Sequence, residues 1–102
     1  MSGDAEIRKE AGPSKGRYVL TEQGAEAELT YSVISPTKII ADHTGVAEAQ
    51  QGGFFGKLMG AGKRLVAHMV EDARANGFSV IALCPFVAAM ARRHPEWSDV
   101  FV

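Results

Sequence analysis

Apolar and polar residues alternate over residues 26–34, which is the pattern of a strand with one buried face. The apolar positions of this segment are Ala27, Leu29, Tyr31 and Val33. Apolar segments at 17–21 and 38–44 lie on either side of it in the sequence, and turn-forming residues at 22–24 and 35–37 separate the three. Short connections of this kind join antiparallel neighbours, so the first half of the chain predicts a three-stranded meander.

Helical spacing replaces this alternation in the second half of the chain. Over 63–76, apolar side chains recur three and four residues apart with charged residues between them, and an Asn-Gly pair is a fitting end for this helix. Residues 78–84 are mostly apolar, as in a strand buried on both faces. Because a helix precedes this strand, a crossover connection places it parallel to the strand at 38–44. A second, shorter helix is expected over 86–94, opened by the proline before it.

These elements predict a single domain over residues 17–102, preceded by a flexible arm over residues 1–16. The arm is polar, with Ile7 as its one large aliphatic residue after the initial methionine, and an edge strand around Ile7 is the alternative. The tail at 96–102 carries Trp97 and is expected to pack back onto the domain. The predicted fold class is α/β (α+β), with a mainly antiparallel sheet of about four strands and two helices.

Composition and charge narrow the classes of function. The chain has 102 residues, 46% of them hydrophobic and 23% charged, which is ordinary for a soluble globular protein. Its net charge of -1 gives no general reason to bind nucleic acid or acidic membranes, and no apolar run approaches the roughly 20 residues that cross a bilayer. Cys84 is the only cysteine and the three histidines are scattered, so we expect no internal disulfide, no metal site and a cytoplasmic location. The expected assembly is a monomer or a weak dimer.

A glycine-rich stretch at 45–62 joins the third predicted strand to the long helix and is expected to be mostly loop. Backbone N–H groups of such a loop, with a helix N-terminus behind them, form an anion site, and Lys57, Lys63 and Arg64 are placed to add positive charge. A phosphate-binding P-loop is excluded because neither Gly-Lys pair is followed by Ser or Thr, and a dinucleotide-binding fingerprint is also missing. A loop without a ligand is the alternative.

Chemically reactive side chains end two of the predicted strands. The sequence Asp42-His43-Thr44 ends one, and Cys84 ends the other. If these strands are parallel neighbours, both groups lie toward the edge of the sheet where ligands usually bind. A Cys–His pair can form a thiolate nucleophile, so His43 and Cys84 are the candidate catalytic residues. The alternative is that Cys84 is a small buried side chain and that His43 only hydrogen-bonds across the sheet.

Four linked signatures resemble a known family. They lie at residues 39–46, 81–87 and 94–97 and at the helix end, 71–74. Together they are similar to the small, YjdJ-type subfamily of GNAT acetyltransferases, and the resemblance covers about residues 17–101. It implies a trimmed GNAT-like fold without the N-terminal helices of larger members. It also implies acetyl-CoA as the acetyl donor and N-acetyl transfer to an unidentified amine.

The resemblance further implies a turn, Gln/Arg-x-x-Gly-x-Gly/Ala, whose backbone amides hold the pyrophosphate of the cofactor. Two registers fit this turn, one at residues 57–62 and one at 51–56, and the first is preferred because it directly precedes the clear helix. With the strand end included, the expected cofactor-binding residues are Thr44, Val46, Lys57, Gly60, Ala61, Gly62 and Lys63.

In the implied reaction, His43 is the candidate general base for an amine that attacks the thioester directly. Cys84 offers a second route in which it first takes the acetyl group and then passes it on. Two other kinds of function stay open. One is a non-catalytic module that binds coenzyme A or acetyl-CoA, and the other is a protein-interaction domain that uses Phe54, Phe55 and Trp97.

Overall fold

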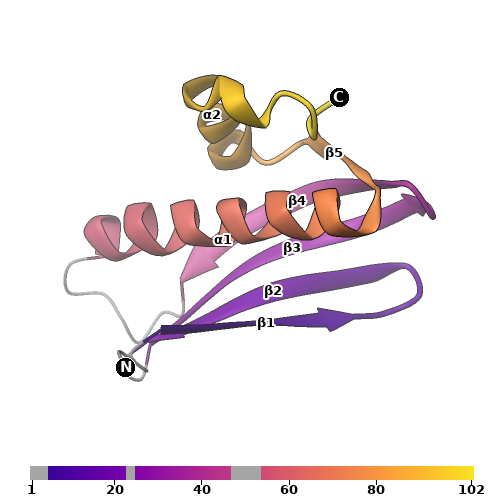
Figure 1. The fold of residues 1–102 in the computed structure, drawn as a ribbon. Helices are drawn as coiled ribbons and strands as arrows, with labels where there is room; N and C mark the ends of the chain where they lie inside the picture. The colour runs from indigo at the N-terminus through magenta and orange to yellow at the C-terminus, as the bar shows by residue number, and fades with distance from the viewer. Residues whose placement is uncertain (1–4, 23–24, 47–53) are drawn as a thin grey trace.

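Five strands form one sheet, which two α-helices and a short 3-10 helix accompany (Figure 1). The structure is a computed structural model and describes residues 5–22, 25–46 and 54–102. The strands follow one another across the sheet in the order β1-β2-β3-β4-β5. The elements are β1 (Ala5–Ala11), β2 (Lys15–Glu22), β3 (Ala25–Ser35), β4 (Lys38–Val46), α1 (Phe54–Asn76), β5 (Ser79–Ala82), α2 (Pro85–Arg93) and η1 (Pro95–Trp97).

The strand pairing confirms the predicted meander and the predicted crossover. Strands β1 to β4 pair antiparallel in sequence order. Strand β5 pairs in parallel with β4, from Lys38 opposite Ser79 to Ala41 opposite Ala82. The predicted fold class is therefore confirmed, with one strand more than the four expected.

The additional strand is β1, which lies in the segment expected to be a flexible arm. It pairs with β2 along its whole length, from Ala5 opposite Glu22 to Ala11 opposite Gly16, so the expectation of a flexible arm is wrong for this segment. Residues 1–4 lie outside the described part of the chain. The edge strand around Ile7 was only the alternative expectation, because charged residues dominate this segment. Cross-strand ion pairs hold these residues, among them Glu10 with Arg17 at 2.7 Å.

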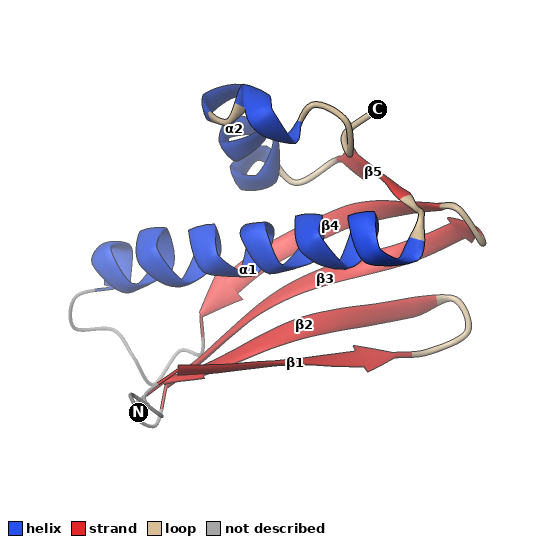
Figure 2. Cartoon of the chain, viewed as in Figure 1, coloured by secondary structure: helices blue, strands red, loops and turns tan. Residues whose placement is uncertain are grey.

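Helix α1 crosses one face of the sheet and covers its apolar side (Figure 2). The alternation predicted for β3 is confirmed, because Ala27, Leu29 and Tyr31 are all buried in the core. The core residues that α1 contributes are spaced three and four residues apart, as expected for an amphipathic helix. The fully buried side chains include Tyr18, Leu20, Leu29, Leu65, Val66, Met69, Val70, Val80 and Val87.

The C-terminal tail packs back onto the domain, as expected, and it also pairs with the outer edge of β5. The N–H of Val80 donates to the carbonyl oxygen of Val100 at 2.9 Å, and the N–H of Val102 donates to the carbonyl oxygen of Val80 at 3.0 Å. The Trp97 side chain is 8% exposed and belongs to the same core cluster as α1 and α2. The tail therefore contributes to the core and protects an edge that would otherwise offer unpaired backbone groups.

The opposite face of the sheet carries mainly polar side chains around the buried Val19. The described helices do not cover this face, because α1 and α2 pack into one core on the other side. Ion pairs run across this helix-free face, including Arg8 with Glu10 at 2.9 Å and Arg17 with Glu28 at 2.6 Å.

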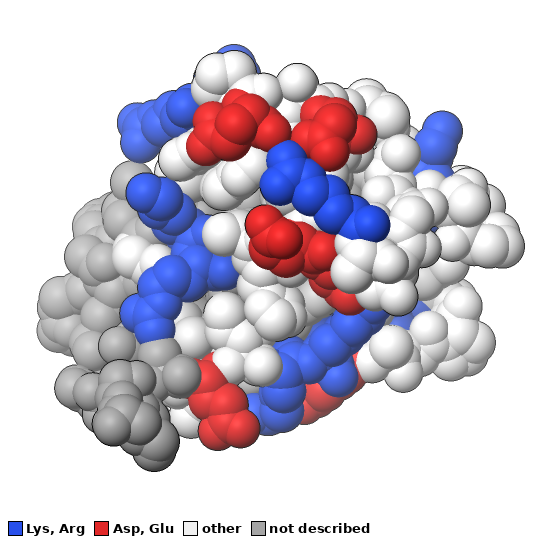
Figure 3. Space-filling view, viewed as in Figure 1, with Lys and Arg blue, Asp and Glu red and all other residues white. Residues whose placement is uncertain are grey.

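On the side seen in Figure 1, positive and negative side chains are interspersed (Figure 3). None of the helices in the described part of the chain is long and apolar enough to cross a membrane.

Candidate functional site

Strands β4 and β5 separate after a short stretch of pairing. Beyond Ala82 the chain leaves the sheet, and the N–H groups of Leu83 and Cys84 both donate to the carbonyl oxygen of Ala41, at 3.2 and 2.9 Å. Strand β4 continues to Val46, paired there with β3 alone. The second half of β4 therefore has backbone on its β5 side that no described strand pairs with.

Thr44 and Cys84 come together where the strands separate. The Oγ1 atom of Thr44 lies 3.6 Å from Sγ of Cys84. Both side chains are buried, with exposed fractions of 9% and 5%. Cys84 also directly precedes α2, whose first residue is Pro85. The expectation that both strand ends meet at one place is confirmed, but the polar neighbour of the thiol among the described residues is a hydroxyl group.

The side chain of His43 lies on the helix-free face instead. A bulge in β4 leaves Asp42 as an extra residue, because Thr30 pairs with His43 and Tyr31 pairs with Ala41. The imidazole lies over Gly45, where a Cβ atom would stand 2.9 Å from Nε2 of His43. Since Thr44 is buried on the helix side, His43 and Cys84 lie on opposite sides of the sheet. The structure thus does not form the Cys–His pair that the sequence suggested.

The bulge also turns Asp42 onto the helix-free face, next to His43. The hydroxyl of Ser32 donates to Oδ2 of Asp42 at 2.7 Å, which fixes the carboxylate between β3 and β4. Two consecutive residues of a regular strand point to opposite faces, so only a bulge brings these two side chains together. Asp42 was not expected to be a site residue, because a bulge has no dependable signature in one sequence.

The preferred register of the pyrophosphate turn lies within a helix. Residues 57–62 were expected to form a loop, but α1 begins at Phe54 and contains them all. Backbone N–H groups beyond the first turn are engaged within the helix and cannot hold an anion. This removes the backbone of Gly60, Ala61, Gly62 and Lys63 from the expected cofactor site. The alternative register ends inside the first turn of α1, and its residues 51–53 lie outside the described part of the chain.

The remaining expected cofactor-binding residues, Lys57, Val46 and Thr44, lie at the start of α1 and at the end of β4. Lys57 lies in the first turn of α1, where backbone N–H groups lack partners within the helix, and its side chain is outside the described part. Val46 is the last residue of β4 and pairs with Ala27, and its side chain is likewise outside that part. Thr44 has the most fully described position, beside Cys84.

Packing explains why glycine is tolerated inside α1. A Cβ atom on Gly62 would lie 2.5 Å from the ring of Phe86, so this glycine allows α2 to approach α1 closely. Gly60 is exposed, and a Cβ atom there would meet nothing within 4 Å. The two glycines therefore form a matched pair, one required by packing and one not.

Alanine substitutions of these glycines should have opposite effects on stability. Gly60→Ala is expected to raise the free energy of unfolding by about 0.5–1 kcal/mol, since alanine is the better helix former. Gly62→Ala makes the same gain but forces the Phe86 ring to move, at a cost of about 1–3 kcal/mol, so it should destabilise the protein overall. Urea unfolding of both variants measures this difference. Equal stabilisation by the two substitutions would contradict the close packing of α1 on α2.

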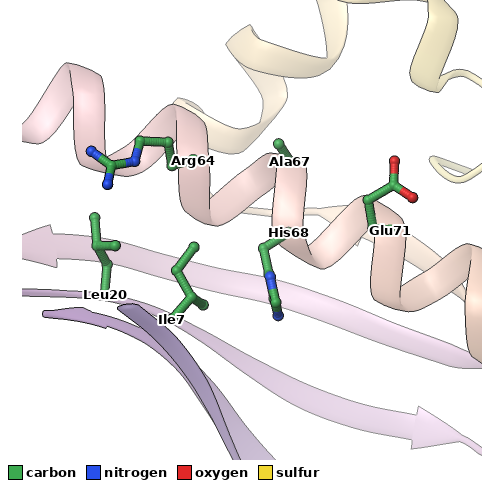
Figure 4. A pocket seen from close by; sticks show the side chains of 6 residues that line it. All are labelled: Ile7, Leu20, Arg64, Ala67, His68 and Glu71. Carbon is green, nitrogen blue, oxygen red and sulfur yellow. The ribbon is translucent and has the colours of Figure 1, made fainter. Parts of the chain in front are cut away.

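A separate cavity of about 480 Å³ lies between α1 and the first two strands (Figure 4). Its floor includes Ile7 and Leu20, which are paired across β1 and β2, and His68 points toward it from α1. Arg64, which was expected to add positive charge to the anion site, lines this cavity, whereas His43, Thr44 and Cys84 do not. Among the described residues no group of three or more His, Cys, Asp or Glu side chains is arranged to hold a metal ion.

Comparison with known proteins places the chain in a family. A search among curated proteins finds no match for it. The family described as GCN5-related N-acetyl-transferase matches residues 17–100, which run from β2 through the tail and include Thr44, Cys84 and the separated strands. Strand β1 lies outside the matched residues. The chain therefore belongs to the GCN5-related N-acetyltransferase family.

Proposed function

We propose that the protein transfers an acetyl group from acetyl-CoA to an amine. The family match supports acetyl transfer as the class of reaction. The observation that carries the assignment of the site is the separation of β4 from β5, with Thr44 and Cys84 at that point. On the motif residues given above we also place the protein in the small YjdJ-type subfamily, as a monomer or weak dimer. Its single cysteine supports a cytoplasmic location.

The chain offers acetyl-CoA two kinds of backbone contact. Extended backbone without a strand partner binds extended ligands through its N–H and C=O groups, and β4 after Ala41 is such a segment on its β5 side. The first turn of α1, from Phe54, carries N–H groups without helical partners and the positive end of the helix dipole, which favour a pyrophosphate. We therefore replace the register at 57–62 with the one at 51–56. When bound, acetyl-CoA supplies the acetyl group as an activated thioester.

His43 is the residue that we propose as general base. An ammonium group must lose a proton before its nitrogen can attack, and the nitrogen loses a second proton as the amide forms. A neutral imidazole can accept one of these protons. The exposed position of His43 on the helix-free face lets an amine approach from solvent. A backbone N–H group of β4 would polarise the carbonyl that the amine attacks.

Direct transfer to the amine fits the surroundings of Cys84 better than a covalent route. The thiol is 5% exposed, and its described polar neighbour is Thr44, which is not a base. We expect Cys84→Ser to retain activity within about threefold, and the intact mass of the wild-type protein to stay unchanged after incubation with acetyl-CoA. Enzyme assays measure the activity of both proteins, and mass spectrometry measures their intact masses.

A covalent route through Cys84 predicts a different and equally specific result. In a covalent route, the Cys84 sulfur would bond the acetyl carbon, the thioester C–S bond of acetyl-CoA would break, and the coenzyme A thiolate would leave with the thiol proton. A mass gain of one acetyl group that disappears in Cys84→Ser, together with loss of transfer, would establish that route. Binding of acetyl-CoA without transfer to any amine would instead favour the non-catalytic module.

A further inference from the structure

A second hollow, of about 430 Å³, lies on the helix-free face over strands β2, β3 and β4. Its floor is backbone, because Gly16 has no side chain and the side chain of Tyr31 lies on the other side of the sheet, where its hydroxyl covers Gly16. The lining residues are Lys15, Gly16, Arg17, Thr30, Tyr31 and Asp42. Two of these side chains, Lys15 and Asp42, give the hollow opposite charges at its two ends.

The negative end is built by the bulge in β4. Asp42 is half-buried, and its Oδ2 atom accepts the hydrogen bond from Ser32. Its other oxygen accepts no hydrogen bond from the described residues. The nearby guanidinium of Arg17 is already balanced by Glu10 and Glu28, at 2.7 and 2.6 Å. An oriented carboxylate with one oxygen available, on the same face of the sheet as His43 and next to it in sequence, suits an ammonium group.

The positive end lies two strands away, on β2. Lys15 pairs with Ser32 on β3, so its Cα lies roughly 10 Å from β4 at the usual strand spacing. Its side chain is exposed and forms no ion pair with a described residue. The long, flexible stem lets its ammonium reach over the hollow toward an anion.

We propose that this hollow is the acceptor site and that the acceptor is an amine with a carboxylate several methylene groups away. The amine binds Asp42 beside His43, and the carboxylate binds Lys15. The inference rests on the proposed function, because it names the substrate class of the same reaction. The ammonium first gives one proton to His43, and the freed nitrogen bonds the acetyl carbon. The thioester C–S bond then breaks, and the coenzyme A thiolate leaves with the second proton of that nitrogen.

The test compares 6-aminohexanoate with hexylamine, which has the same chain length but no carboxylate. We expect Lys15→Gln to raise KM for 6-aminohexanoate roughly tenfold, to leave kcat unchanged and to leave KM for hexylamine unchanged. Asp42→Asn keeps an oxygen for Ser32 and should raise KM for both amines by a similar factor. Arg92→Gln, on the exposed end of α2, is the matched control and should change neither.

A separate titration with acetyl-CoA distinguishes failure of the proposed function from failure of the proposed acceptor site. If acetyl-CoA does not bind, the proposed function fails. If it binds with equal affinity to wild type and both variants, the proposed function stands and the amine kinetics test the acceptor site alone. Unchanged KM values in Lys15→Gln and Asp42→Asn, or no transfer to 6-aminohexanoate at saturating acetyl-CoA, would overturn the acceptor site.

Discussion

Trp97→Ala should lower the free energy of unfolding by about 3–5 kcal/mol, the largest loss that we expect from a single substitution outside the sheet. The indole is 8% exposed, joins the core cluster and stacks on His94, with ring centroids 4.2 Å apart and an angle of 19° between the planes. A domain of this size is stable by only about 5–15 kcal/mol in total, so the variant should be barely stable.

Urea unfolding followed by circular dichroism is the suitable measurement, since the variant lacks the only tryptophan. Val102→Ala is the matched control, because that side chain is 68% exposed and should cost less than about 0.5 kcal/mol. A loss below 1 kcal/mol for Trp97→Ala would mean that the tail is not part of the core.

Asp72→Ala is expected to lower the free energy of unfolding by about 2–4 kcal/mol. The reason is that Asp72 on α1 binds side chains from β1, from β2 and from the end of its own helix. Its carboxylate accepts hydrogen bonds from Lys9 at 2.6 Å, from the Tyr18 hydroxyl at 2.7 Å and from Asn76 at 2.7 Å. Tyr18 has no exposed surface, so without Asp72 its hydroxyl would lack a described partner, which costs about 1–3 kcal/mol. The ammonium of Lys9 would also lose the ion pair that holds β1 against α1.

A double-mutant cycle with Tyr18→Phe tests the cause of this loss. Phenylalanine removes the buried hydroxyl, so in the Asp72→Ala background it should restore stability, giving a coupling energy of at least about 1 kcal/mol. Glu71→Ala is the control on the same helix, since the Glu71 side chain is 74% exposed. Independent, additive effects of the two substitutions would contradict the Tyr18–Asp72 hydrogen bond.

The same carboxylate gives stability a defined dependence on pH. Burial alone would raise the pKa of Asp72, but the hydrogen bonds from Lys9 and Tyr18 outweigh it and hold the pKa below its usual value. A pKa lowered by folding stabilises the protein above the unfolded value of about 3.9, and this stabilisation is lost as the pH falls through the folded value. The stability difference between wild type and Asp72→Ala should therefore shrink as the pH is lowered from about 5 into the acid range.

Much of the sheet could be predicted because its physical cause lies in the local pattern. Strand β3 has one buried and one polar face, so its alternation is regular. The apolar run at β5 after a helix was enough to predict its parallel pairing with β4. Strand β1 has no such pattern. Ion pairs with β2 and the contact of Lys9 with α1 hold it in place, and its local sequence does not reveal these partners.

The site was predicted less well, because its geometry depends on which side of the sheet each side chain occupies. A regular β4 would give no reason for Asp42 and His43 to share a face, but the bulge places them together and away from Cys84. The start of α1 was misplaced because glycine normally weakens a helix by about 1 kcal/mol per residue. At Gly62, contact with Phe86 on α2 gives glycine a packing role that no local rule can show.

We propose that acetyl-CoA binds where β4 and β5 separate, and an NMR titration of backbone amides with acetyl-CoA tests this site most directly. We expect chemical shift changes at Thr44, at Cys84 and in the first turn of α1, with none at the β1–β2 turn around Gly12. Changes confined to the cavity lined by Leu20 and His68, or none at millimolar acetyl-CoA, would contradict it.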